Sequence, residues 1–212
     1  MREDGRVAST ASSGRDLEVR SQGLQAALVE VGDTPRALAL AQWVRHRVGS
    51  DVEVVPGART VLVDGVDPAG VSALVGEWPG EHATADGPLV TLGVRYDGPD
   101  LLVVAEHWGC TTAEVVERHQ RTTYTSAFTG FAPGFAYLAG LPEELRVPRL
   151  ASPRPRVPAG SVALADTWCG IYPGESPGGW LLIGRVEEEL WDATRDQPAL
   201  LSPGTQVRFV AR

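Results

Sequence analysis

The 212-residue chain lacks several features that would place it in a familiar class of proteins. It has only two cysteines, Cys110 and Cys169, without CxxC spacing, so two free and mostly buried thiols are expected. No apolar run approaches the roughly 20 residues that span a bilayer, and residues 1–22 have no apolar centre of the kind found in secretory signals. A net charge of −8 disfavours nonspecific binding to nucleic acid or to an anionic membrane. We therefore expect a cytoplasmic protein that binds neither.

The chain also lacks the residue patterns of several common kinds of active site. Its four histidines and two cysteines are scattered without ligand spacing, so no metal site is expected. Ser161 and Ser176 lie outside a GxSxG context, which argues against a serine hydrolase. Gly32 and Gly49 are isolated, so the N-terminal part has no recognisable phosphate loop.

Local patterns divide the chain into a tail and two domains. Residues 1–22 are rich in Ser, Arg, Gly and Asp and predict a disordered tail. Residues 23–86 predict a small α+β domain of split βαβ type, whose first helix has Thr34 as its N-cap and Pro35 in its first turn. The polar segment 81–88 predicts a linker. Residues 87–212 form the second domain.

One helix of the second domain is clearly signalled and ends in a titratable residue. Thr111 and Glu114 fit a capping box, in which each side chain accepts a hydrogen bond from a free amide at the helix start. His119 lies near the end of this helix, on the same face as Val115. It either packs in the core near the helix C-terminus or points a titratable ring into a cleft. The residues alone slightly favour the core.

The stretch 125–185 carries most of the functional signal. Glycine and proline recur every few residues, so short strands at 124–128, 161–164, 170–172 and 180–183 must alternate with stiff loops. Polar side chains on such loops are typical of a binding or catalytic site. A loop-rich structural β domain is the alternative, although three arginines and many aromatic residues would be unusual there.

The side chains of this stretch suggest a pocket for a small anion or polar acid. Arg154 and Arg156 are two residues apart on an extended segment, so both can face one side and bind carboxylate or phosphate. Alternatively, both pair with surface acids. Other groups would complete the pocket: Tyr172, Glu175 and Ser176 as polar groups, and Phe131, Phe135, Tyr137 and Trp180 as apolar walls. Two of these apolar side chains have an alternative role: Trp180 can belong to the core, and Tyr137 can anchor a turn.

Three motifs in this stretch resemble one protein family. They are GFAPGFAYL at 130–138, PRPRVPAGSV at 153–162 and GIYPGESPGGW at 170–180. Several long motifs in a fixed order are a specific signal. The chain resembles the family that includes the B subunit of bacterial 5-oxoprolinase and the sporulation kinase inhibitor KipI, also described as the first subunit of allophanate hydrolase. The resemblance implies an α+β fold: a small N-terminal domain followed by a cyclophilin-like β-barrel.

The resemblance also implies an activity and partners. In 5-oxoprolinase, the B subunit and a carboxyltransferase-like C subunit handle ATP-dependent activation of 5-oxo-L-proline, and a separate A subunit opens the ring to give L-glutamate, ADP and phosphate. ATP is then the cofactor, with magnesium held by the complex, and the chain alone is expected to be inactive. We hypothesise that catalysis involves His119, Glu175 and Ser176. On the matching motifs, substrate- or ATP-binding positions are Phe131, Pro133, Gly134, Phe135, Tyr137, Arg154, Arg156, Ser161, Tyr172 and Trp180.

The chain departs from the family pattern at a few positions, and other functions stay open. DTWC at 166–169 stands where many members have Gly-Gly-Gln-Thr, and Ala136 stands where many have proline. The segment at 96–99 is shortened. These differences bear on substrate identity more than on fold. The alternatives to part of a 5-oxoprolinase are a KipI-like inhibitor of a sensor histidine kinase and a part of a urea- or allophanate-related carboxyltransferase with a biotin-carrying partner.

Overall fold

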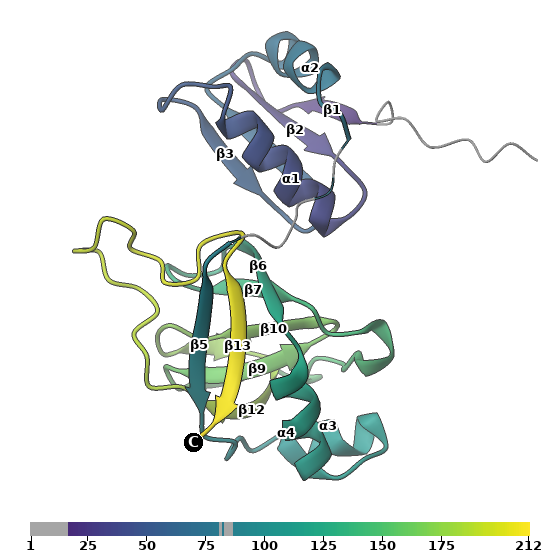
Figure 1. The fold of residues 1–212 in the computed structure, drawn as a ribbon, viewed down its shortest axis with the longest axis vertical. Helices are drawn as coiled ribbons and strands as arrows, with labels where there is room; N and C mark the ends of the chain where they lie inside the picture. Colours follow the sequence, from purple (N-terminus) through teal and green to yellow (C-terminus); the bar gives the residue numbers. More distant parts are fainter. Residues whose placement is uncertain (1–16, 81, 83–86) are drawn as a thin grey trace, which may run out of the picture.

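A computed structural model describes residues 17–80, 82 and 87–212. The chain forms a small four-stranded unit with two helices, followed by a larger unit built on a seven-stranded sheet (Figure 1). Helix α1 and strand β3 of the small unit contact strand β6 of the large one. The predicted α+β class is confirmed. None of the helices within the described residues is long and apolar enough to cross a membrane.

The small unit has the predicted split βαβ topology. Its sheet is antiparallel in the order β1-β2-β4-β3, so β4 lies between the two strands that α1 connects. The apolar face of α1 packs on this sheet as its helical spacing predicts. The elements are β1 (Glu18–Ser21), β2 (Ala26–Glu30), α1 (Thr34–Arg45), β3 (Glu53–Pro56), β4 (Thr60–Asp64) and α2 (Pro68–Gly76).

Two local predictions for this unit need correction. The tail was predicted to be disordered to residue 22, but β1 pairs with β2 because its Val19 packs against the small core and its backbone completes the sheet edge. Residues 1–16, and most of the linker segment 81–88, lie outside the described residues. The N-cap of α1 is Asp33 and not Thr34: the Asp33 carboxylate accepts a hydrogen bond from the Arg36 amide at 2.9 Å, while the Thr34 hydroxyl donates to the Ala58 carbonyl.

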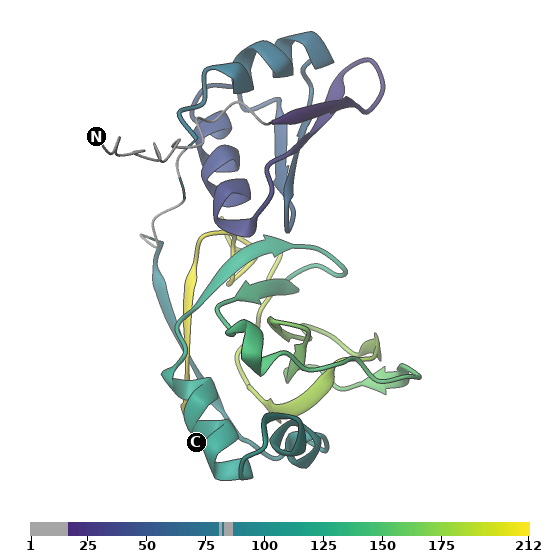
Figure 2. The same cartoon turned by 90° about the vertical axis from the view of Figure 1, so that its right-hand side faces the viewer.

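The large unit is a nearly closed barrel (Figure 2). Its strand order is β12-β9-β10-β7-β6-β13-β5, with only β13 and β5 parallel. The two ends of the sheet meet where Arg95 and Arg185 exchange backbone hydrogen bonds of 2.9 Å. The elements are β5 (Leu89–Val94), α3 (Leu101–Trp108), α4 (Thr112–Arg121), β6 (Tyr124–Thr129), β7 (Ala136–Ala139), the 3-10 turn η1 (Glu143–Leu145), β8 (Arg154–Val157), β9 (Ser161–Ala165), β10 (Trp168–Ile171), β11 (Ser176–Gly178), β12 (Leu181–Arg185) and β13 (Gln206–Ala211).

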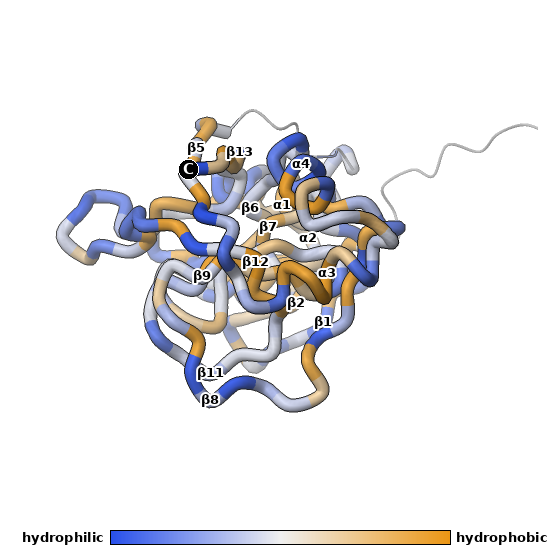
Figure 3. The backbone as a smooth tube through the Cα atoms, turned by 90° about the horizontal axis from the view of Figure 1, so that it is seen from below, coloured by the Kyte–Doolittle hydropathy of each residue, from blue (hydrophilic) through white to orange (hydrophobic). Residues whose placement is uncertain are grey.

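Strands β8 and β11 form a separate two-stranded ribbon outside the barrel (Figure 3). The ribbon covers part of the outer face of the sheet, so β9 is buried on both sides. Because side chains alternate along a strand, Val162 and Leu164 point into the barrel core, and Ala163 and Ala165 point into a second core under the ribbon. This second core contains most of the aromatic residues singled out in the sequence.

Candidate functional site

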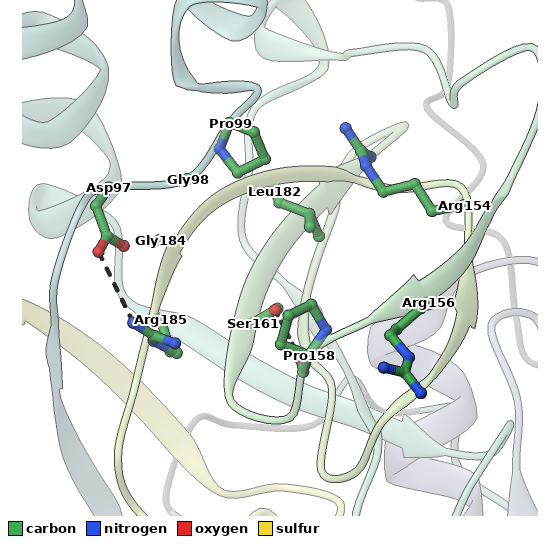
Figure 4. Close-up of a pocket in the computed structure, with 10 residues that line it drawn as sticks. All are labelled: Asp97, Gly98, Pro99, Arg154, Arg156, Pro158, Ser161, Leu182, Gly184 and Arg185. Atoms are coloured by element: carbon green, nitrogen blue, oxygen red, sulfur yellow. Dashed lines mark hydrogen bonds and ion pairs between the residues drawn. The ribbon is translucent and has the colours of Figure 1, made fainter.

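Most of the predicted site residues are distributed over three hollows of the large unit. What we call the charged cavity measures about 340 Å³ and is lined by Asp97, Gly98, Pro99, Arg154, Arg156, Pro158, Ser161, Leu182, Gly184 and Arg185 (Figure 4). The aromatic cavity measures about 230 Å³ and is lined by Phe131, Phe135, Tyr137, Arg149, Pro153, Tyr172, Pro177, Gly178, Gly179 and Trp180. A third hollow of about 440 Å³ is lined by Thr129, Gly130, Phe131, Ala132, Pro133, Gly134, Trp191 and Ala199.

The charged cavity lies beside the seam that closes the barrel. One wall is the loop after β5, which passes so close to β12 that a side chain at Gly98 would collide with the Leu182 carbonyl. A side chain at Gly184 would likewise collide with the Arg95 carbonyl. The opposite wall is β8 of the ribbon, which brings Arg154 and Arg156 to the same cavity, as their spacing predicts. Glycine at the seam is therefore what lets the two walls approach.

Arg154 is fixed by a buried carboxylate that the sequence analysis did not assign to the site. Asp100 is only 5% exposed, and its two oxygens accept hydrogen bonds of 2.7 Å from Arg154 Nη2 and from the Leu182 amide. The Arg154 side chain itself is 27% exposed. A buried charge needs a partner of this kind. Asp100 is the N-cap residue of α3, yet its side chain makes no capping hydrogen bond.

The other cations of the charged cavity are held more loosely. Arg156 Nε lies 3.0 Å from Glu175 Oε1, but these side chains are 75% and 54% exposed, and such pairs contribute little. Arg185, which sequence analysis also missed, lies 3.9 Å from Asp97 Oδ2 (Figure 4). Its position two residues after the predicted strand at 180–183 carried no separate signal. Asp97 is the only carboxylate among the ten lining residues, so the cavity favours an anion.

Ser161 has a structural role in the wall of this cavity. It is 5% exposed, and its hydroxyl donates a 2.7 Å hydrogen bond to the Pro158 carbonyl across the turn between β8 and β9. Ser176 is the first residue of β11 and Glu175 lies just before it; both are outside the lining of all three hollows. Ser176 Oγ is buried without a hydrogen-bond partner in the described part of the chain.

The aromatic cavity is built on the second core. Phe135, Tyr172 and Trp180 are buried, and the Phe135 ring meets both others edge to face, with centroids 5.4 Å from Tyr172 and 5.6 Å from Trp180. A Cβ at Gly170 would lie 2.9 Å from both Phe135 and Trp180, so a glycine lets these rings rest on β10. The alternative of a core role for Trp180 is therefore correct, although one side of the ring still lines the cavity.

The loop between β6 and β7 shapes the mouths of the aromatic cavity and the third hollow. Phe131 is 60% exposed and has φ of 68°, a conformation that is strained for a bulky side chain. Gly134 has φ of 84° and packs against Trp191, where a Cβ would lie 2.7 Å from the Trp191 Cβ. Pro133 and Gly134 line the third hollow and not the cavity that contains Arg154.

His119 is in the barrel core, which corrects its predicted assignment to the catalytic set. The ring is 0% exposed, its Nδ1 lies 2.8 Å from the Tyr96 hydroxyl, and its Nε2 lies 3.5 Å from Cys169 Sγ. It also stacks on Phe209 with centroids 4.4 Å apart. Burial lowers the pKa of His119 to about 3 and raises the pKa of the Cys169 thiol. His119 lines none of the three hollows, so it is not brought together with Glu175 or Ser176.

Two other predictions concern thiols and metals. Cys110 and Cys169 are both free, as expected. Within residues 17–80, 82 and 87–212, no three His, Cys, Asp or Glu side chains gather as metal ligands would. The polar groups that do converge are guanidinium groups, which suit carboxylates and phosphates.

Known proteins resemble this chain in sequence and in structure. The 5-oxoprolinase B subunit of Escherichia coli O157:H7 is 42% identical over 168 residues, which cover 75% of this chain and 77% of that protein. The crystal structure of TTHA0988 matches with a TM-score of 0.75 and 36% identity over 92% of this chain, but this chain covers only 40% of that one. The K. lactis urea amidolyase matches with a TM-score of 0.68 over 92% of this chain and 15% of its own; at 19% identity it shows a shared fold alone.

The match to a family profile covers almost the whole described chain. The profile is described as carboxyltransferase domain, subdomain C and D, and it matches residues 17–201. The match therefore includes both the split βαβ unit and most of the barrel, with all three hollows. The chain belongs to this carboxyltransferase subdomain C and D family.

Proposed function

We propose that this chain is the B subunit of an ATP-dependent 5-oxoprolinase, which converts 5-oxo-L-proline, ATP and water to L-glutamate, ADP and phosphate. The observation that carries this proposal is the 42% identity to a protein named as the B subunit of 5-oxoprolinase, over three quarters of both chains. The urea amidolyase match supports no competing activity, because its identity is too low to carry more than fold.

The charged cavity is the place we propose for the phosphates of ATP. Arg154, Arg156 and Arg185 line it from two sides, and guanidinium groups bind phosphate oxygens through paired hydrogen bonds. At about 340 Å³, it lies at the lower end of the range of roughly 300–1,000 Å³ typical of small-molecule sites. Asp97 alone is a poor ligand set for magnesium, so the metal would be held by ATP and by another protein of the complex.

We propose that the chain is inactive alone and works with two other proteins. The resemblance implies a carboxyltransferase-like C subunit, which would share the activation step, and an A subunit that opens the lactam ring. Of the two candidates for proton transfer, His119 is buried in the core, and Glu175 is an exposed residue that pairs with Arg156. Groups that move protons during the reaction would then come from the partners.

The test is co-expression with a carboxyltransferase-like partner, followed by ATP turnover with the ring-opening A subunit present, with and without 5-oxo-L-proline. We expect a stable complex whose ATP turnover rises with 5-oxo-L-proline. Arg156→Gln should raise the KM for ATP at least about ten-fold, since charge-assisted hydrogen bonds are worth about 1.5 kcal/mol or more. Arg121→Gln is the matched control, because Arg121 is an 80% exposed arginine on α4 that pairs only with Glu117 in the described chain.

Two results would count against the proposal. A complex that turns over ATP without any response to 5-oxo-L-proline would indicate another lactam or amide. A chain that forms no complex, but inhibits a sensor histidine kinase, would favour the KipI-like role instead.

A further inference from the structure

The aromatic cavity and the charged cavity are separate sites of the large unit. They have no lining residue in common. Consecutive residues Pro153 and Arg154 face different cavities, because side chains alternate along an extended segment. Just before and within β12, Trp180 lines the aromatic cavity and Leu182 lines the charged one. A pocket that uses all the predicted residues at once does not form.

The two cavities differ in whether their arginines are already paired with an acidic side chain. Arg154 and Arg156 in the charged cavity already pair with Asp100 and Glu175. Arg149 in the aromatic cavity forms no ion pair within the described part of the chain. Its guanidinium carbon lies 5.8 Å from the centre of the Trp180 ring, in the range of a cation–π contact. An incoming carboxylate therefore meets a cation with no competing acid.

The walls of the aromatic cavity favour a flat and weakly polar ligand. Phe135, Tyr172 and Trp180 are buried and packed edge to face, so the cavity keeps its shape without a ligand. Its volume of about 230 Å³ is below the usual range for drug-sized ligands, roughly 300–1,000 Å³, and suits a body the size of an amino acid. The strained, exposed Phe131 stands at the mouth, 5.3 Å from the Phe135 ring centre.

We propose that the aromatic cavity binds a small flat ring that carries a carboxylate, with Arg149 holding the carboxylate and the aromatic rings holding the ring faces. This inference rests on the proposed function in one respect: it identifies the ring acid as the lactam 5-oxo-L-proline. Of the two roles left open for Arg154 and Arg156, it assigns them the ATP phosphates and not the substrate carboxylate. Substrate and nucleotide then occupy separate cavities of the same chain.

The first test compares KM values in the complete complex. Arg149→Gln should raise the KM for 5-oxo-L-proline about ten-fold or more and leave the KM for ATP within two-fold of wild type. Arg156→Gln should show the opposite pattern. Arg149→Lys keeps the charge but not the planar fork, so it should recover only part of the loss. Arg121→Gln should change neither KM.

The second test measures binding without turnover. The complex is titrated with 5-oxo-L-proline and with 2-pyrrolidinone, the same lactam ring without a carboxylate. Wild type should prefer the acid about ten-fold or more, and Arg149→Gln should lose that preference while still binding the neutral ring. If Arg149 only supports the fold, Arg149→Gln should weaken the binding of both ligands equally.

The outcomes separate this inference from the proposed function. If turnover responds to 5-oxo-L-proline but Arg149→Gln leaves its KM within two-fold, the inference is overturned and the function stands. If turnover does not respond, but binding of the acid depends on Arg149, the function fails and the site stands. If the complex binds neither ligand, or if Arg149→Gln raises both KM values equally, the cavity is not a ring-acid site.

Discussion

Acid is expected to destabilise this protein through His119, a single side chain in the barrel core. The folded barrel lowers the pKa of His119 from 6.5 to about 3, because the ring is fully buried and burial disfavours its charged form. Between pH 6.5 and pH 3 the unfolded chain therefore binds a proton that the folded chain excludes. Stability falls as the pH decreases through this window and stops falling, for this group, below about pH 3.

The size of the effect follows from the width of the window. One pKa unit corresponds to about 1.4 kcal/mol, so lowering the pH from 7 to 4.5 costs the folded state about 2.5 kcal/mol from His119 alone. That is a large part of the total stability of a typical domain, about 5–15 kcal/mol. The loss should be visible as a shift of the urea midpoint for the barrel.

The assay compares urea unfolding of wild type and His119→Phe at pH 7.0, 5.5 and 4.5. The phenylalanine keeps a ring to stack on Phe209 but loses the contacts with Tyr96 and Cys169, so at pH 7 the variant should be about 1–3 kcal/mol less stable. At pH 4.5 that difference should largely disappear. His107→Gln changes an exposed histidine of α3 and serves as the control, with the acid dependence of wild type. If wild type and His119→Phe lose stability in parallel between pH 7 and 4.5, the reasoning is wrong.

Three further substitutions test the walls of the two cavities. Asp100→Asn keeps an oxygen for the Leu182 amide but removes the charge that holds Arg154. The free energy of unfolding, measured in urea, should fall by about 2–3 kcal/mol, and the KM for ATP should rise. Gly170→Ala places a methyl group against two aromatic rings of the second core, so thermal unfolding should show a loss of about 1–3 kcal/mol. Phe131→Gly relieves a positive φ, so stability should stay within about 1 kcal/mol while the KM for 5-oxo-L-proline rises; a loss of several kcal/mol would mean that Phe131 supports the fold.

Much of the fold could be predicted because its signals are local. The capping box of α4 needs only residues three apart, and both of its reciprocal hydrogen bonds form between Thr111 and Glu114. The split βαβ unit follows from short apolar runs separated by turn residues. In the 125–185 stretch, β6, β9, β10 and β12 were predicted within a few residues, since glycine and proline mark where strands must end. The short strands β7, β8 and β11 were not predicted.

The site was harder to predict because its decisive contacts join distant parts of the chain. Asp100 meets Arg154 from 54 residues away, and His119 meets Cys169 from 50 residues away. Spacing along the chain indicated correctly that Arg154 and Arg156 share a side, but it could not show that neighbouring residues face two different cavities. The five consecutive buried residues of β9 look like an ordinary core strand, although they separate two cores.

Arg154 and Arg156 are held by ion pairs of unequal strength, which suggests that they have different roles in the charged cavity. Arg154 is held by a buried carboxylate, and breaking such a pair costs several kcal/mol, so this guanidinium stays in place when an anion arrives. Arg156 gives up an exposed pair with Glu175 that is worth at most about 1 kcal/mol, so it can turn toward the anion at little cost. Arg154 would thus fix where the anion binds, and Arg156 would close on it. Because Glu175 competes for Arg156, Glu175→Gln should lower the KM for ATP about two-fold, whereas an unchanged or higher KM would mean that Arg156 does not move.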